Sequence, residues 1–341
     1  MDSLTTMMGG RRKRTRFVDS FAAVSDRWQQ HTGTLSVSSG LRAATIAARG
    51  PNLVSNGEFT TNTTGWTPFQ ASISRVNSSV DPGVASGGAD SWAGKTAITV
   101  GTPAYVYQDV TTIVGATYAV AGRGYAPSAN TQDYAAAIEL LLTTWGTYRL
   151  APVSAEDVWE PITALPTVSV ASPSRISLRV RGATVGDTAY FDALTCYRHN
   201  AVATLRSWPS PNGVFTLDMP IPASGVVPFS FIARYTDDLN FWEVRVTPNT
   251  AGTDLQLIEV VAGVATVRAS ADVDWTAGAT DQMRITANGA SIAVEAKKSG
   301  AGSWSAACDY GSCATGLTAR DHGLMFYSAS VTRVSRVEFR L

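Results

Sequence analysis

The chain has 341 residues, enough for two domains at roughly 150 residues each. Hydrophobic residues make up 45% of it and charged residues only 16%, which excludes a disordered chain and leaves ample material for a core. Lys and Arg total 27, as do Asp and Glu, so no net charge attracts nucleic acid or an acidic surface, and no apolar run of about 18 residues forms a membrane helix.

The first sixteen residues carry a cluster of basic side chains. These are Arg11, Arg12, Lys13, Arg14 and Arg16. They follow a polar stretch, whereas a secretory signal places its charges before an apolar segment, so export by a signal peptide is not predicted. We expect residues 1–16 to form a flexible basic arm, or an arm that docks through these charges on an acidic neighbouring subunit.

Beyond residue 16 the sequence alternates between apolar and polar residues in short segments. Ile176, Leu178 and Val180 share one face of a segment whose other face carries arginines. The same alternation recurs in residues 229–235 and 337–341, and turn dipeptides such as Asn-Gly separate the segments. The sequence therefore predicts an all-β fold of β-sandwich or jelly-roll domains.

The predicted strands fall into three blocks. Residues 17–50 hold about three short strands, too little chain to bury a core alone. A new pattern runs through residues 51–198, and residues 199–341 form another strand-rich block. Two arrangements are possible. Residues 17–50 either form a linker-like segment ahead of the other blocks, or pair with residues 199–341 and enclose residues 51–198 as an insertion.

The middle block opens and closes with distinctive segments. They are Asn52–Phe59 (NLVSNGEF), Thr64–Trp66 (TGW), Val106–Val110 (VYQDV), Gly115–Tyr118 (GATY) and Ala189–Leu194 (AYFDAL). Together they resemble carbohydrate-binding modules of the jelly-roll type. The resemblance implies that Trp66 packs in the core and that Glu58 and Asp192 hold a structural calcium ion. Ala193 stands where such modules have a second acid, which removes one calcium ligand, and the alternative is that Glu58 and Asp192 pair with arginines.

The two flanking blocks share a second pattern. Its segments are Asp19–Phe21 (DSF), Trp28, Gly33–Val37 (GTLSV) and Gly40–Arg42 (GLR) before the middle block, and Asn240–Arg245 (NFWEVR), Leu255–Leu257 (LQL), Gly289–Ile292 (GASI) and Gly323–Phe326 (GLMF) after it. They resemble a laminin-G or concanavalin-like sandwich. Because its two halves lie on either side of residues 51–198, insertion is the better interpretation. Chains that combine these two kinds of module are similar to minor tail and adhesin proteins of tailed bacteriophages.

Candidate catalytic residues are few. His31, His199 and His322 lack the spacing of a catalytic triad or a metal site, and we expect them at the surface or in loops. Glycosidases need two carboxylates that flank one bond, and the nearest pair, Asp272 and Asp274, is typical of a turn edge. The sequence therefore predicts no enzyme, no catalytic residues and no cofactor beyond the calcium ion.

Aromatic residues of the middle block are better candidates for binding. Sugars present apolar C–H faces, so their sites offer flat rings beside hydrogen-bonding groups. Tyr118 and Tyr190 alternate as core residues do. Rings in or beside turn-rich segments are therefore the predicted glycan platform: Trp92, Tyr125, Trp145, Tyr148 and Trp159.

The three cysteines suggest at most one disulfide. Cys308 and Cys313 are separated by four residues that include a glycine, a spacing that could close a hairpin disulfide. Cys196 alternates with Leu194 and is predicted to be a small buried residue.

Two classes of function remain open. The first is a non-enzymatic structural protein of a bacteriophage virion, tail-associated, that displays a glycan-binding module for adhesion to a host cell-surface polysaccharide. It would be a homo-oligomer among other virion proteins, without nucleic-acid contacts or membrane insertion. The second is a secreted carbohydrate-active enzyme or its binding appendage. A capsid decoration protein is a further alternative to the tail-associated one.

Overall fold

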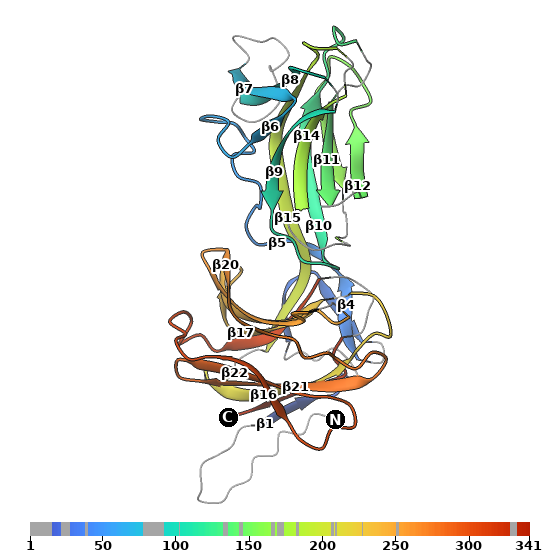
Figure 1. Cartoon of the computed structure of the whole chain (residues 1–341). Coiled ribbons are helices and arrows are strands. Elements are labelled where there is room, and N and C mark those ends of the chain that lie inside the picture. The colour runs from blue at the N-terminus through green and yellow to red at the C-terminus, as the bar shows by residue number, and fades with distance from the viewer. Residues whose placement is uncertain are drawn as a thin grey trace, which may run out of the picture. The chain divides into compact units, whose positions relative to one another are not determined.

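The chain folds into two compact units of antiparallel strands. Unit 1 comprises residues 1–51 and 199–341, and unit 2 comprises residues 52–198 (Figure 1). The prediction of two all-β domains, one inserted into the other, is confirmed. The computed structural model describes residues 16–21, 28–37, 40–77, 92–101, 103–131, 136–142, 146–164, 168, 174–181, 184–205, 208, 210–226, 228–249, 252–327 and 333–341.

Unit 1 is a sandwich of two sheets. One sheet has the order β1 (Arg16–Asp19), β25 (Arg336–Arg340), β16 (Gly213–Pro220), β21 (Thr280–Asn288), β22 (Ser291–Lys297) and β23 (Ser305–Tyr310). The facing sheet has the order β2 (Trp28–Thr32), β15 (Thr188–Leu205), β24 (Asp321–Phe326), β17 (Phe229–Asp237), β18 (Asn240–Val246), β19 (Leu255–Val261) and β20 (Val264–Ala271). A hairpin is formed by β3 (Thr34–Val37) and β4 (Leu41–Thr45), and β5 (Ala47–Arg49) pairs with β15.

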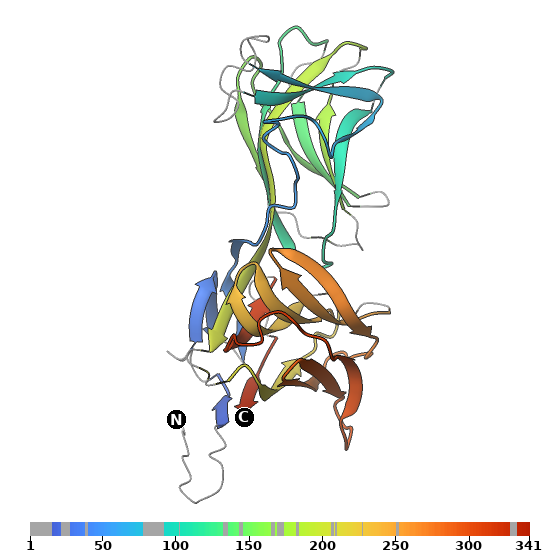
Figure 2. The ribbon, with the colours of Figure 1, turned by 90° about the vertical axis from the view of Figure 1, so that its left-hand side faces the viewer.

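The two ends of the chain meet in this sandwich. β1 pairs with β25 in a register that runs from Arg16 opposite Arg340 to Asp19 opposite Val337. Figure 2 shows the blue strand β1 next to the red strand β25. β2 pairs with the end of β15, and Leu41 bridges Val334. The early strands therefore complete the sheets that the last third of the chain builds.

Arg16 belongs to the fold and not to the predicted arm. Its Nε donates to Glu338 Oε1 at 2.8 Å, and it begins the strand that pairs with β25. Arg16 is part of the strand because β1 alternates: Phe17 points toward the core and Arg16 lies on the opposite face of the strand. Arg11, Arg12, Lys13 and Arg14 lie outside the described residues.

Unit 2 also has two sheets. The first has the order β13 (Glu160–Ala164), β10 (Thr117–Tyr125), β15, β8 (Trp92–Ile98) and β7 (Ala71–Asn77). The second has the order β12 (Gly146–Pro152), β11 (Ala136–Leu142), β14 (Ser174–Val180), β9 (Ala104–Val110) and β6 (Thr67–Phe69).

The opening segment of unit 2 is tied to β15 by backbone hydrogen bonds and by the side chain of Asn52. The amide of Asn52 donates to Leu194 O at 3.2 Å and accepts from the Cys196 N–H at 2.8 Å. The Phe59 ring then packs where only a glycine fits, because a Cβ on Gly94 would lie 2.7 Å from it. Trp66 is buried beside Phe59, with ring centroids 5.8 Å apart, which confirms its predicted core position.

The predicted disulfide is absent, since Cys308 and Cys313 are free thiols. Cys308 lies within β23 opposite Val294, whereas Cys313 lies beyond the strand, where its N–H donates to Ala290 O at 2.8 Å. Burial raises the pKa of Cys308 to about 11, so this thiol is held in its unreactive protonated form. Cys196 is buried, as predicted.

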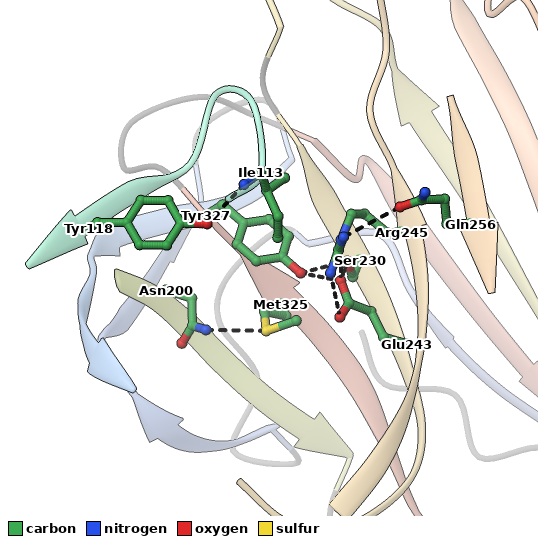
Figure 3. Close-up of polar contacts among 9 residues, drawn as sticks. All are labelled: Ile113, Tyr118, Asn200, Ser230, Glu243, Arg245, Gln256, Met325 and Tyr327. Carbon is green, nitrogen blue, oxygen red and sulfur yellow. Dashed lines mark hydrogen bonds and ion pairs between the residues drawn. The ribbon is translucent and has the colours of Figure 1, made fainter. Parts of the chain in front are cut away.

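A polar network is buried on β17 and β18 of unit 1 (Figure 3). Glu243 accepts from Arg245 Nε at 2.7 Å and Nη2 at 3.0 Å, from Ser230 Oγ at 2.8 Å, and from the Tyr327 hydroxyl. Burial alone would lower the pKa of Arg245, but Glu243 and Tyr327 outweigh it and raise the pKa. The carboxylate is therefore fully paired despite its burial.

We expect Arg245→Met to lower the free energy of unfolding of unit 1 by about 3–5 kcal/mol, because it strands a buried carboxylate. The double variant E243L/R245M should cost less than R245M alone, since the Ser230 and Tyr327 hydroxyls, 3.1 Å apart, can bond to each other. Urea unfolding measures the free energy of unfolding of the single and the double variant. The matched control is R284M, which breaks a half-exposed pair with Glu295 and should cost less than about 1 kcal/mol. A double variant as unstable as R245M would contradict this account.

Candidate functional site

Trp92 is covered on one face. The Arg75 guanidinium carbon lies 3.1 Å from the Trp92 ring centroid, and Arg75 Nε donates to Phe59 O at 2.7 Å. Because consecutive residues of a strand face opposite sides, Trp92 points away from the side that its neighbour Ala93 faces. The stacked arginine covers one of the two faces of the ring.

Tyr125 and Trp159 lie together, with ring centroids 5.7 Å apart. Tyr125 also packs edge-on against Tyr190 at 5.6 Å, and Ala93 completes the cluster. Trp159 is only 8% exposed, so the expectation that it offers an open ring is wrong. The reason is that its apolar neighbours bury the ring. Tyr190 is buried, as predicted.

The rim of this cluster is polar. The Tyr125 hydroxyl donates to Asp157 Oδ1 at 3.1 Å, and the Ser128 N–H donates to the same oxygen at 3.0 Å. Hydrogen bonds from Ser128, and then from Tyr125, lower the pKa of Asp157. Of the other predicted rings, Trp145 lies outside the described residues, and so does the side chain of Tyr148, whose backbone lies in β12.

A second group of rings lies on the other sheet of unit 2. In β9, Tyr105, Tyr107 and Asp109 alternate with buried residues, so they share the outer face of the sheet. Cross-strand register places Phe69 of β6 opposite Tyr105, and Arg179 of β14 opposite Tyr105 on the other side. Residues directly opposite each other share a face. We call this group the aromatic face; its residues are Phe69, Tyr105, Tyr107, Asp109, Arg175 and Arg179.

The rings of the aromatic face form a strip. Phe69 and Tyr105 stack with centroids 5.0 Å apart and planes 21° apart, and Tyr107 follows at 6.0 Å from Tyr105. Phe69 is 42% exposed, and both tyrosines are half-buried. A strip of partly exposed rings along the outer face of a sheet is the kind of surface that the apolar face of a sugar can contact.

A fixed positive charge borders the strip. Arg175 donates to Asp109 through Nε at 2.8 Å and Nη2 at 3.1 Å, and its guanidinium carbon lies 3.5 Å from the Tyr107 ring centroid. The hydrogen bond to Asp109 is the main cause that raises the pKa of Arg175. Nearby, Ser177 Oγ is buried without a hydrogen-bond partner among the described residues. The strip therefore lies beside oriented N–H donors.

Phe69, Tyr105 and Tyr107 are not among the rings that the sequence predicted as a glycan platform. The signal was present in the segment Ala104–Val110, where the two tyrosines and an aspartate alternate with core residues. Phe69 gave no such signal, because it sits in a three-residue strand beside Pro68. Only the pairing of β6 with β9 brings it to Tyr105.

The two predicted calcium ligands differ in their surroundings. Glu58 is exposed, whereas Asp192 is completely buried in β15. Within the described part of the chain, no three His, Cys, Asp or Glu side chains gather as a metal site would require. Because Ca²⁺ also accepts backbone carbonyls, the calcium ion stays a prediction.

The candidate catalytic residues have local structural roles. Asp274 Oδ2 accepts from Lys298 at 3.1 Å on the surface. His31 lies in β2 and His199 in β15, both partly exposed, whereas His322 lies in β24 and is completely buried, so the expectation of a surface or loop position is wrong for His322. Each occupies a strand position that sequence spacing alone did not reveal.

His322 is the most buried of the three. Its Nδ1 accepts from the Arg234 N–H at 3.3 Å, and its Nε2 lies 3.2 Å from Ser210 O. Burial lowers the pKa of His322 to about 4, and the positive charge of Arg234 acts in the same direction. The hydrogen bond to Ser210 acts in the opposite direction. The neutral His322 ring therefore links β24 to the segment that contains Ser210.

Comparison with known proteins adds little. No protein-family model and no curated protein matches the chain. Among solved structures, it is similar to the carbohydrate binding module CBM66 from Bacillus subtilis, with 13% identity, a TM-score of 0.31, and coverage of 41% of this chain and 78% of that chain. It is also similar to the N-terminal CBM22-1-CBM22-2 tandem domain from Paenibacillus barcinonensis Xyn10C, with 11% identity, a TM-score of 0.33, and coverage of 86% and 98%. At such TM-scores neither likeness carries an argument about a ligand.

Among the described segments, none is a helix long and apolar enough to span a membrane.

We expect the stability of unit 1 to fall between about pH 6.5 and pH 4 because of His322. The unfolded chain takes up the proton at about pH 6.5, whereas the folded chain resists it down to about pH 4, so the loss reaches up to about 3 kcal/mol. Urea unfolding across this range measures it. H322Q keeps an acceptor and a donor but cannot titrate, and should lose less stability over the same range. Equal slopes for both proteins would contradict the assignment.

Proposed function

We propose that unit 2 binds carbohydrate on the aromatic face. The observation that carries the proposal is the stacked pair of Phe69 and Tyr105 beside the ion pair of Arg175 and Asp109. Rings supply contact for sugar C–H groups, and the ion pair supplies oriented donors and acceptors for sugar hydroxyls. The outer position of these residues on the sheet suits an extended polysaccharide.

Each contact of this kind is weak. A single site is expected near millimolar affinity, about −4 kcal/mol. Several copies of the chain in one assembly would raise the effective affinity by about 10² or more. A homo-oligomer is therefore part of the proposal, and host cell-surface polysaccharide is the proposed partner.

We propose that the chain is a non-enzymatic, tail-associated protein of a bacteriophage virion. What supports this is that chains combining a laminin-G or concanavalin-like sandwich with an inserted carbohydrate-binding-module-like jelly roll, as the sequence segments here do, are similar to tail and adhesin proteins of tailed bacteriophages. The alternatives are a secreted carbohydrate-active enzyme or its appendage, and a capsid decoration protein. Mass spectrometry of purified particles and of culture supernatant, with a polysaccharide hydrolysis assay, tests the placement. Peptides in the particles are expected; a free chain with hydrolytic activity would contradict it.

Phe69→Ala and Tyr105→Ala should each weaken binding of a glycan identified on a polysaccharide array by about tenfold, because each removes one stacking contact. Both side chains lie on the outer face, so thermal unfolding should change little. The matched control is Y125A, which removes a half-buried ring from the other sheet and should leave binding unchanged. Loss of binding in Y125A with normal binding in F69A and Y105A would move the site to the Tyr125 cluster.

A further inference from the structure

Three arginines surround one glutamate on the outer face of the first sheet of unit 1. Glu338 Oε1 accepts from Arg16 Nε at 2.8 Å and from Arg340 Nε, and Oε2 accepts from Arg336 Nη2 at 2.5 Å. Arg336, Glu338 and Arg340 are alternate residues of β25, and Arg16 of β1 lies directly opposite Arg340. All four side chains therefore share a face, while the intervening Val337 and Phe339 enter the core.

The cluster has an excess of positive charge. Glu338 is 4% exposed, and although burial alone would raise its pKa, hydrogen bonds from Arg16 and Arg340 lower the pKa to about 2. Among the described residues, one further carboxylate faces the group: Asp218 of β16 lies 3.8 Å from Arg336 and also accepts from Gln282 of β21 at 2.7 Å. Three guanidinium groups thus face two carboxylates. The excess lies at Arg16 and Arg340, whose side chains are 55% and 57% exposed.

Glu338 holds the guanidinium groups in place before any ligand arrives. Each guanidinium carries five N–H donors, and the bonds to Glu338 use only a few of them. Guanidinium forks match the oxygen spacing of phosphate and sulfate groups, and a fixed side chain loses less entropy on binding. The cluster therefore has the chemistry of a preorganised oxyanion site.

The positive surface is short. On the next strands of the sheet, Arg284 of β21 is paired with Glu295 of β22 at 2.5 Å, and Lys297 of β22 lies opposite Gln282 on the same face. The rings on the two strands of the cluster, Phe17 and Phe339, pack against the core, and the partly exposed ring of Trp304 lies over Arg284, two strands away. A short positive patch with no ring of its own on the outer face fits isolated anionic substituents better than the regular phosphates and bases of a nucleic acid.

We propose that Arg16, Arg336 and Arg340 bind phosphate or sulfate substituents of an acidic polysaccharide. This site is separate from the aromatic face, does not depend on the function proposed for unit 2, and gives unit 1 a binding role of its own.

The test measures binding of the full chain to dextran sulfate, to phosphorylated dextran and to uncharged dextran. We expect tighter binding to one or both charged polymers than to uncharged dextran, and weakening of the charged-polymer binding as salt rises. The two charged arms identify which anion the site prefers. R340Q should weaken binding about tenfold, since it removes one charge-assisted contact. R284Q is the matched control, a half-exposed arginine of the same sheet, and should bind as the wild type does.

R340Q alters a largely exposed side chain and is expected to fold, and thermal unfolding checks this. R16Q is the second variant, and it should weaken binding to a similar extent. Wild-type binding by both R340Q and R16Q would overturn the proposal, as would an equal loss in R284Q. Equal affinity for single-stranded DNA of matched charge would overturn the assignment to a polysaccharide. Failure of the aromatic-face variants to affect this binding is expected, because the two sites lie in different units.

Discussion

The sandwich of unit 1 depends on the packing around a single ring, that of Phe339 in the last strand. Five aromatic rings surround it at centroid distances of 4.9–6.3 Å: Phe17, Trp28, Trp208, Phe215 and Phe231. These come from β1, β2, β16, β17 and the segment before β16. Burying such rings is the largest favourable contribution a core of this size receives. The first strands therefore have their partner at the far end of the chain, and residues 52–198 must fold between them.

Alternation in the sequence was sufficient to predict several strands, and the resemblance to a laminin-G-like pattern split across the chain predicted the insertion. Alternation marked β14 and β25 residue by residue, and the split laminin-G-like pattern predicted that the early strands pair with the late ones. Side-chain contacts between segments that are distant in the sequence were not predictable. Trp159 looked exposed because its segment is rich in turn residues, yet Tyr125 and Ala93 from other strands cover it.

The aromatic face shows the same limit. Phe69, Tyr105 and Arg179 lie far apart in the sequence, and only the register of β6, β9 and β14 brings them onto one surface. A shift of one residue in that register would turn the rings inward, so no reading of composition could have placed them. Arg16 was misassigned for a related reason: its charge matches the basic run before it, whereas its partner Glu338 lies at the other end of the chain.

Charged residues are scarce in this protein, and many of those described are used in pairs. Glu243 with Arg245 is buried, whereas Asp109 with Arg175 and Glu338 with its arginines lie at outer faces. A buried pair fixes one arrangement of strands, while a pair at the surface holds side chains ready for a ligand. The same chemistry thus serves structure in one place and, in our proposals, recognition in two others.

The most direct measurement of the central claim is the position of a bound glycan on unit 2. Chemical-shift changes of aromatic side-chain resonances during titration with a glycan that binds would locate it. The account predicts that the rings of Phe69, Tyr105 and Tyr107 shift and that those of Tyr125 and Trp159 do not. Shifts confined to Tyr125, Trp159 or Trp92 would contradict it.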